Sequence, residues 1–164
     1  MPRNFKSTEP LQKPDPKFDS ILATKLINKI MSDGKKSTAQ DIFYEAMDLS
    51  LKRIAEVEGE TDIEKQINIF TRAVENAKPQ VEVRSKRVGG ANYQVPREVK
   101  RQRQRSLAIR WLIDNARKKK GKPMAKKLAD EICDAYNGTG ATVTWKENVH
   151  KMAEANKAYA HYAR

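Results

Sequence analysis

The side chains best suited to hold a chemical group are positively charged and crowded between Arg84 and Arg105. Eight arginines and lysines occupy this stretch beside one acid, Glu98. Guanidinium and ammonium groups at this density repel one another unless an anion neutralises them. The phosphates of a nucleic acid are such an anion, so the stretch predicts a polyanion-binding segment.

A glycine pair, Gly89-Gly90, divides this basic stretch in the middle. Apolar and polar residues alternate on both sides of it, with Val81 and Val83 before the pair and Tyr93 and Val95 after it. Alternation around a two-residue glycine turn is typical of a β-hairpin, and we expect a two-stranded ribbon over residues 80–95. Because a lone ribbon is marginally stable in water, we expect this one to complete its folding against a partner.

The whole chain is basic. Its 164 residues carry 33 lysines and arginines against 21 aspartates and glutamates, a formal charge of +12. Proteins of this charge bind nucleic acid more often than acidic membranes. No apolar run approaches the roughly 20 residues of a membrane span, and no apolar signal segment follows Met1. The single cysteine, Cys133, cannot form an internal disulfide, which favours a reducing compartment. We expect Cys133 to be a small residue of the core.

The charge is unevenly distributed. Residues 41–64 contain eight acids and two bases, a net charge of −6. The excess positive charge therefore lies in the ribbon, in the segment after it and in residues 117–127. This segregation predicts a one-sided contact with a polyanion. A solvated basic face remains the alternative, above all for Lys118 to Lys122.

Apolar spacing and capping signals predict an extended arm over residues 1–18 and a single helical domain over residues 19–164. Four prolines oppose helix in the arm. The predicted helices run from Asp19 or Ser20 to Gly34, from Ser37 to Gly59, from a capping box at Thr61–Glu64 to Pro79, from within 98–103 through Ala116, from Pro123 to Gly138, and from a second capping box at Thr144–Glu147 to Tyr162. The expected fold class is all-α, with about six helices and an inserted, protruding two-stranded β-ribbon.

Catalytic interpretations find little support. The run Gly34-Lys35-Lys36-Ser37 resembles the tail of a phosphate loop, but Lys29 stands where that motif needs its first glycine. His150 and His161 lack the spacing of a helical zinc pair. We therefore predict no enzyme activity, no cofactor, no metal and no small-molecule substrate. Trp111 and Trp145 are expected in the core or along a groove, whereas Tyr93 could stack on a base or pack across the ribbon.

Several motifs together resemble ribosomal protein seven of the bacterial-type small subunit. They are Pro14-Asp-Pro-Lys-Phe18, Met31-Ser-Asp-Gly-Lys-Lys-Ser37, Pro79-Gln-Val-Glu-Val83, Arg87-Val-Gly-Gly90, Tyr93-Gln-Val-Pro96 and the tail His150 to Tyr162. The resemblance covers the chain in order from about Pro14 to Tyr162. It departs from the family in an arginine-poor arm, a long acidic connection over residues 54–62, and Arg97 where an apolar residue is common.

The resemblance implies a structural rRNA-binding protein with a protruding ribbon. Members of this family bind the 3′ major domain of small-subunit rRNA and start assembly of the subunit head. They line the path of exit-site tRNA and mRNA, and in some bacteria repress translation of their own operon's message. Implied partners are this rRNA, tRNA, mRNA and the neighbouring proteins nine and eleven of the small subunit. The implied location is the cytoplasmic ribosome, with an organelle ribosome left open and no membrane contact.

Two sets of site residues follow. The predicted rRNA-binding set is Arg3, Lys35, Lys36, Arg84, Lys86, Arg87, Arg97, Lys100, Arg101, Arg103, Arg105, Arg110, Lys118, Lys119, Lys120 and Lys122. The predicted exit-site set is Val88, Gly89, Gly90, Asn92, Tyr93, His150 and Lys157. Two other functions stay open: a chromosomal DNA-binding protein, which would not prefer a folded RNA junction, and a small RNA-processing enzyme, which would need an acid/base or metal cluster.

Overall fold

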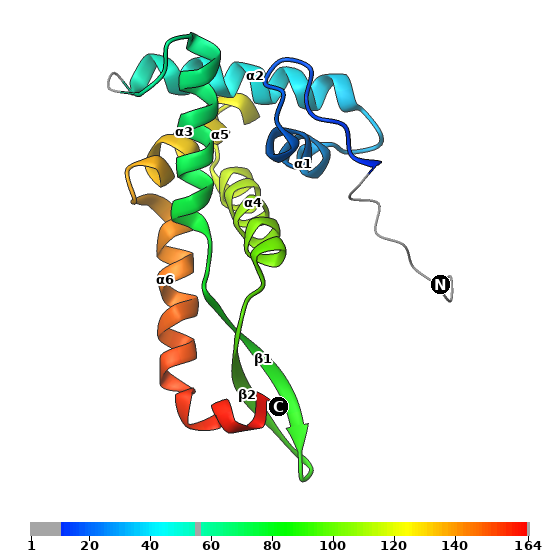
Figure 1. The fold of residues 1–164 in the computed structure, drawn as a ribbon, viewed down its shortest axis with the longest axis vertical. Helices are drawn as coiled ribbons and strands as arrows, with labels where there is room; N and C mark the ends of the chain where they lie inside the picture. The colour runs from blue at the N-terminus through cyan, green and yellow to red at the C-terminus, as the bar shows by residue number, and fades with distance from the viewer. Residues whose placement is uncertain (1–10, 55–56, 164) are drawn as a thin grey trace.

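The computed structural model describes residues 11–54 and 57–163 and confirms the expected fold class. Predictions about residues 1–10, Arg3 among them, and about Glu56 lie outside the described residues. A helical body occupies one end of the molecule, and a two-stranded ribbon extends from it alongside the last long helix (Figure 1). This arrangement separates the predicted basic ribbon from the acid-rich segment at the far end of the body.

The first two helices, α1 (Ile21–Ile30) and α2 (Lys36–Arg53), begin near their predicted starts but end earlier than predicted. Ser20 caps α1 by accepting a hydrogen bond from the Ala23 amide at 3.4 Å. Gly34, with φ +73°, lies in the turn between the helices rather than at the end of α1. The prediction that α2 reaches Gly59 is wrong. The half-buried Ile54 adopts an extended backbone and packs against the core, which turns the chain away after Arg53.

Helix α3 (Asp62–Ala77) begins at the predicted capping box. The Thr61 hydroxyl accepts from the Glu64 amide, and the Glu64 carboxylate accepts from the Thr61 amide. The helix ends before Pro79, also as predicted. Ile63, placed on the buried stripe by its spacing, is 47% exposed. It lies in the first turn, beyond the reach of the neighbouring helices.

The core forms where α5 (Met124–Tyr136) contacts α2, α3 and α4 (Arg101–Lys118). Phe43 of α2 and Phe70 of α3 meet edge to face with ring centroids 5.3 Å apart. The apolar spacing of α4 and α5 predicts buried stripes, and these are buried, Leu112 and Ile132 completely so, except for the half-buried Tyr136 at the end of α5. Cys133 is buried as expected. Burial of such side chains contributes roughly 1.5–3 kcal/mol each, so this contact surface dominates stability.

The segment before α1 is tied to the body through a buried aspartate. Asp15 accepts hydrogen bonds from the amides of Lys17 and Phe18 and from the Tyr44 hydroxyl at 3.0 Å. Phe18 packs against the Phe43 ring. The chain therefore joins the core at Asp15, within the segment predicted to be an extended arm.

Helix α6 (Gly140–Ala155) does not begin at the predicted capping box, so that prediction is wrong. Thr144 lies one turn inside the helix, where its hydroxyl donates to the Gly140 carbonyl at 3.0 Å. The start is fixed instead by Glu131, a fully buried residue of α5. One carboxylate oxygen of Glu131 accepts from the Thr142 amide at 2.9 Å and from its hydroxyl at 2.6 Å. A long-range bond thus overrides the local signal.

The chain continues past α6 in a tighter helix. Helix α6 ends at Ala155, and a 3₁₀ helix, η2 (Lys157–Ala163), follows it. The predicted single helix to Tyr162 is therefore two elements. The change of direction brings η2 across the ribbon (Figure 1).

The ribbon consists of β1 (Val81–Val88) and β2 (Ala91–Glu98), which pair antiparallel, and it ends three residues later than predicted. Gly89 and Gly90 both have positive φ, as a two-residue hairpin turn requires. The register pairs Val83 with Pro96 and Lys86 with Tyr93. Directly paired residues share a face, so Val83 lies on the face opposite to Tyr93.

The C-terminal elements support this ribbon. The Tyr93 ring lies 5.2 Å from the Tyr159 ring and 5.3 Å from the Tyr162 ring. The Lys86 ammonium donates to the Tyr162 carbonyl at 2.7 Å. Helix α6 contacts β1 as well. Part of the support that a two-stranded ribbon needs is therefore intramolecular.

We expect Gly140→Ala to destabilise the protein more than Gly138→Ala. Both glycines have positive φ, where a non-glycine residue costs about 1–2 kcal/mol. An added Cβ at Gly138 meets nothing within 4 Å, whereas at Gly140 it would lie 2.6 Å from the Asp134 Cβ. Urea unfolding of the two variants should differ by roughly 1 kcal/mol or more. Equal stabilities would contradict the close approach of α5 and α6.

Candidate nucleic-acid interface

The ribbon leads directly into α4, and this connection gathers most of the predicted basic residues. The Val99 amide donates to the Gln80 carbonyl at 3.0 Å and closes the root of the ribbon. The basic residues of this region are all exposed: Arg84, Lys86, Arg87, Arg97, Lys100, Arg101, Arg103 and Arg105. The structure thus brings together two predicted groups, those of the ribbon and those of the first turns of α4, on one continuous surface.

A shallow hollow of about 270 Å³ lies at the root of the ribbon. Four basic residues and two acids line it together with one amide side chain: Arg84, Arg97, Lys100, Arg103, Glu82, Glu98 and Gln102. Two strands and one helix contribute to it. Guanidinium groups donate in pairs to phosphate oxygens, so a lining with three arginines suits an RNA backbone phosphate.

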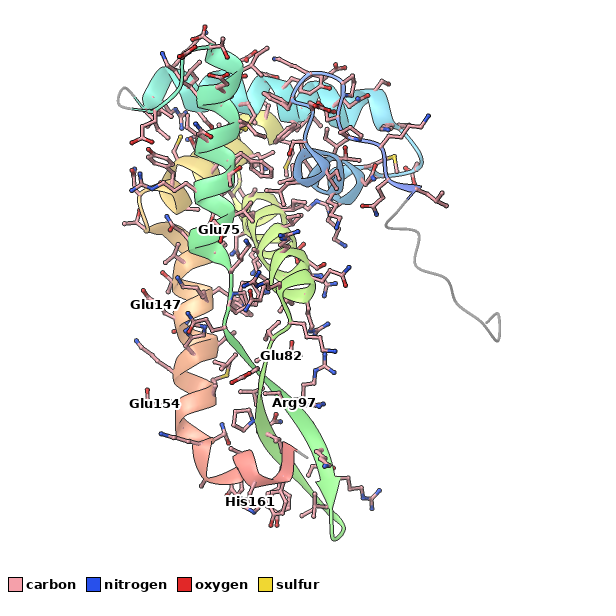
Figure 2. All side chains as sticks on the ribbon, viewed as in Figure 1. Glu75, Glu82, Arg97, Glu147, Glu154 and His161 are labelled. Carbon is pink, nitrogen blue, oxygen red and sulfur yellow. The ribbon has the colours of Figure 1, made fainter. Side chains whose placement is uncertain are left out.

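Glu82 connects the two sides of this hollow. One of its carboxylate oxygens accepts from Arg84 Nε at 2.6 Å, and the other accepts from Arg103 Nε at 2.7 Å. Figure 2 shows Glu82 between the ribbon and α4, with Arg97 on the adjacent strand. Partial burial alone would raise the pKa of Glu82, but the hydrogen bonds from Arg103 and Arg84 outweigh burial and lower it. The carboxylate therefore stays ionised at neutral pH.

A second hollow, of about 240 Å³, lies at the junction of α3 and α4. Arg101 and Arg105, one turn apart on α4, line it with Gln104, Lys78 and Glu75. Glu75 forms an ion pair with Lys78. The first turns of α4 therefore present arginines toward both hollows, and Arg101, Arg103 and Arg105 are all exposed.

Lys35 and Lys36 lie apart from this surface. They are exposed at the start of α2, and the Lys35 cap position has no side-chain capping bond. Figure 1 places the connection between α1 and α2 on the body, away from the ribbon. The structure does not join these two lysines to the ribbon cluster, so one phosphate could not contact both groups.

The basic run after α4 is largely occupied within the chain. Lys119 pairs with the buried Glu131 at 2.8 Å and with Asp134 at 3.3 Å. Burial lowers the pKa of Lys119, but the two carboxylates outweigh it and raise the pKa. Lys122 pairs with Asp130 at 2.9 Å. These ion pairs hold the connection between α4 and α5, and the phosphate contacts expected of the two lysines remain a prediction.

The other basic residues of this part are exposed. Lys118 lies 5.2 Å above the Trp145 ring and donates to Asn115 at 3.3 Å. Arg110 and Lys120 are exposed. Trp145 is 47% exposed on α6, which excludes the core position among the two expected for it, and the Lys118 ammonium lies over its ring.

The predicted exit-site residues do not form one group. Val88, Gly89, Gly90 and Asn92 lie at the ribbon tip, where Gly89 and Gly90 form the turn between β1 and β2. His150 lies at the opposite end, where its Nε2 accepts from the Gln80 amide at 3.1 Å. Burial and the neighbouring Lys146 lower the pKa of His150. Lys157 is exposed at the start of η2.

Tyr93 packs within the protein. It contacts Tyr159 and Tyr162 of η2 rather than a residue of the opposite strand. The packing expected across the ribbon is found instead against η2, and stacking of Tyr93 on a base remains a prediction. Neither η2 tyrosine was singled out beforehand, because three tyrosines so far apart in sequence carry no pattern.

The sequence analysis did not identify Glu82 as a site residue. Its only signal in the sequence was an acid two residues before Arg84 in a basic strand, and its second partner, Arg103, is distant in sequence.

The described residues hold no candidate metal site: within residues 11–54 and 57–163 no three His, Cys, Asp or Glu side chains cluster as metal ligands. None of the helices described is long and apolar enough to cross a membrane.

Comparisons with known proteins agree with this geometry. The family model described as ribosomal protein S7p/S5e matches residues 2–157. The chain is 53% identical to the small ribosomal subunit protein uS7 of Chloroflexus aurantiacus over 92% of this chain and 91% of that protein. It is 49% identical to the uS7 protein of a Roseiflexus strain and 54% identical to that of Koribacter versatilis, each over nearly the full length of both chains.

We expect the root of the ribbon to lose stability as the pH falls. A lowered pKa means that the folded state binds the His150 proton less readily than the unfolded state does. The stability that neutral His150 contributes is therefore complete above the pKa of an unfolded histidine, about 6.5. It is lost as the pH falls through the lower pKa of the folded state. Between pH 7 and pH 5 the parent should lose more unfolding free energy than His150→Gln. A His150→Gln variant that keeps the parental dependence on pH would contradict this assignment.

Proposed function

The chain belongs to the ribosomal protein S7p/S5e family, and from this membership we propose that it is a structural protein of the small ribosomal subunit that binds rRNA through its ribbon and the start of α4. One observation carries the assignment of the surface. Arginines from β1, β2 and α4 are exposed around one hollow, while the acid-rich segment of α2 and α3 lies at the other end of the molecule (Figure 1).

The mechanism is that of a scaffold. The packed helices hold a fixed array of cations, and these neutralise phosphates where several RNA helices come close together. Side chains cannot enter the narrow major groove of A-form RNA, so recognition rests on backbone shape. Specificity then comes from the geometry of the RNA junction, which must match a ribbon and a helix set at a fixed angle.

The finer assignments extend the same proposal. We place the rRNA contact in the 3′ major domain, where the protein would nucleate assembly of the subunit head. The exposed ribbon tip, Val88 to Asn92, would lie beside exit-site tRNA and mRNA. Proteins nine and eleven of the small subunit are the proposed protein neighbours. Repression of its own operon's message would use the same basic surface, because an mRNA that imitates the junction presents the same phosphates.

The first prediction concerns residence on the ribosome. In a sucrose gradient that separates the subunits at low magnesium, the protein should sediment with the small subunit. Crosslinking followed by sequencing of the bound nucleic acid should recover small-subunit rRNA. Chromosomal DNA as the bound species would support the DNA-binding alternative and overturn the proposal.

The second prediction concerns the hollow at the junction of α3 and α4. Each lost phosphate contact should flatten the plot of log affinity against log salt by roughly 0.7–0.9. Arg101→Gln combined with Arg105→Gln should therefore flatten it by about 1.5 for a 3′ major domain transcript. Both side chains are exposed, so thermal stability should stay within roughly 1 kcal/mol of the parent.

Two controls accompany this variant. Lys52→Gln with Lys65→Gln removes the same charge from the acid-rich helices and should leave the salt slope unchanged. Glu58→Gln with Glu60→Gln should not weaken binding, and should strengthen it slightly by reducing long-range repulsion. If either control changes the salt slope as much as the arginine pair, the proposed surface is wrong.

A further inference from the structure

Glu82 is an acid in the most basic part of the molecule. It lies on β1 next to Arg84 and opposite Arg97 in the register, and it lines the hollow at the ribbon root. A negative charge here opposes the approach of a phosphate. Electrostatics alone therefore gives no reason for a carboxylate at this position, and its contacts must be considered.

The geometry of those contacts is specific. Both bonds use the Nε atom of an arginine, Arg84 at 2.6 Å and Arg103 at 2.7 Å. The Glu82 side chain is 13% exposed, whereas the two arginine side chains are almost half exposed. The carboxylate is thus set into the surface, and the guanidinium groups project from it.

A bond through Nε leaves the remaining N–H groups of each guanidinium available. No other hydrogen bond of these two arginines is found within the described part of the chain. A free arginine samples many rotamers, and ordering it on a phosphate costs conformational entropy. An arginine already fixed at Nε has lost part of that freedom before the phosphate arrives.

We propose that Glu82 is a positioning residue for RNA binding: its carboxylate holds Arg84 and Arg103 side by side, one from the ribbon and one from α4, in the orientation that receives a backbone phosphate. The inference rests on the proposed function of the same surface. Because the two arginines belong to different elements, the bridge also fixes the ribbon relative to α4. The phosphate class follows from the paired N–H groups that remain.

Glu98 provides a matched comparison. It lines the same hollow and is exposed, yet its carboxylate forms no hydrogen bond or ion pair with any residue that the structure describes. Glu82→Gln and Glu98→Gln therefore make the same chemical change and the same change in net charge at one site. Only the first removes an arginine partner.

The experiment measures affinity for an in vitro transcript of the 3′ major domain of small-subunit rRNA. Glu98→Gln should bind as tightly as the parent or more tightly. Glu82→Gln should bind roughly 3- to 10-fold more weakly despite its added positive charge, because the ordering of the arginines must then be completed on binding. Binding by Glu82→Gln as tight as that of Glu98→Gln would overturn the proposal.

A double-mutant cycle separates positioning from a general structural effect. In a parent carrying Arg84→Gln and Arg103→Gln, Glu82 has no arginine to position. Adding Glu82→Gln to that parent should not weaken binding further and should strengthen it, as Glu98→Gln does. A loss of affinity as large as in the unmodified parent would show that Glu82 acts through the fold and would overturn the proposal.

A second pair of variants tests the proposal if Glu82→Gln does not fold. Arg103→Lys keeps the charge but removes the Nε donor. Glu82 and the phosphate then compete for the single ammonium group of the lysine. It should weaken binding several-fold more than Arg105→Lys, with an unchanged salt slope. Equal effects of the two would overturn the inference. Failure of the parent itself to bind the transcript would instead overturn the proposed function.

Discussion

The structure depends on the support of a ribbon that cannot stand alone. Two strands in water are marginally stable, and here one of them carries a concentration of like charge that opposes folding further. Helix α6 and η2 provide the missing contacts, through the tyrosine cluster around Tyr93 and the bond between His150 and Gln80. Helix α6 is in turn fixed at its start by the buried Glu131 of α5. The position of the basic surface thus traces back to the core of the helical body.

Charge has two separate uses in this chain. At the root of the ribbon, cations outnumber anions and stay exposed, which suits a surface that meets phosphates. Between α4 and α5, Lys119 and Lys122 form ion pairs with Glu131, Asp134 and Asp130. A basic residue in the sequence can therefore serve the fold or the proposed RNA contact, and only its partners in the folded chain distinguish the two. The density of lysine in residues 118–122 could not make this distinction.

Local signals predicted most elements because their causes are local. The capping box at Thr61 fixed the start of α3, and Gly89-Gly90 fixed the hairpin turn, since both depend on backbone geometry within a few residues. The same kind of signal failed at Thr144, where a carboxylate from another helix starts α6 one turn earlier. It failed again after Arg53, where packing of Ile54 ends α2. Errors occurred where a long-range contact competed with a local preference.

The sequence by itself determined the helical class, the ribbon, the basic character of the surface and, through several motifs at their spacing, the family. These properties depend on periodicity, turn chemistry and composition, which are written in order along the chain. Only the tertiary structure decided that Glu82 joins Arg84 to Arg103, that Lys119 pairs with the buried Glu131, and that Tyr93 packs on η2. In each case at least one partner is distant in sequence, and only the folded chain brings the side chains together. No local pattern could therefore reveal these contacts.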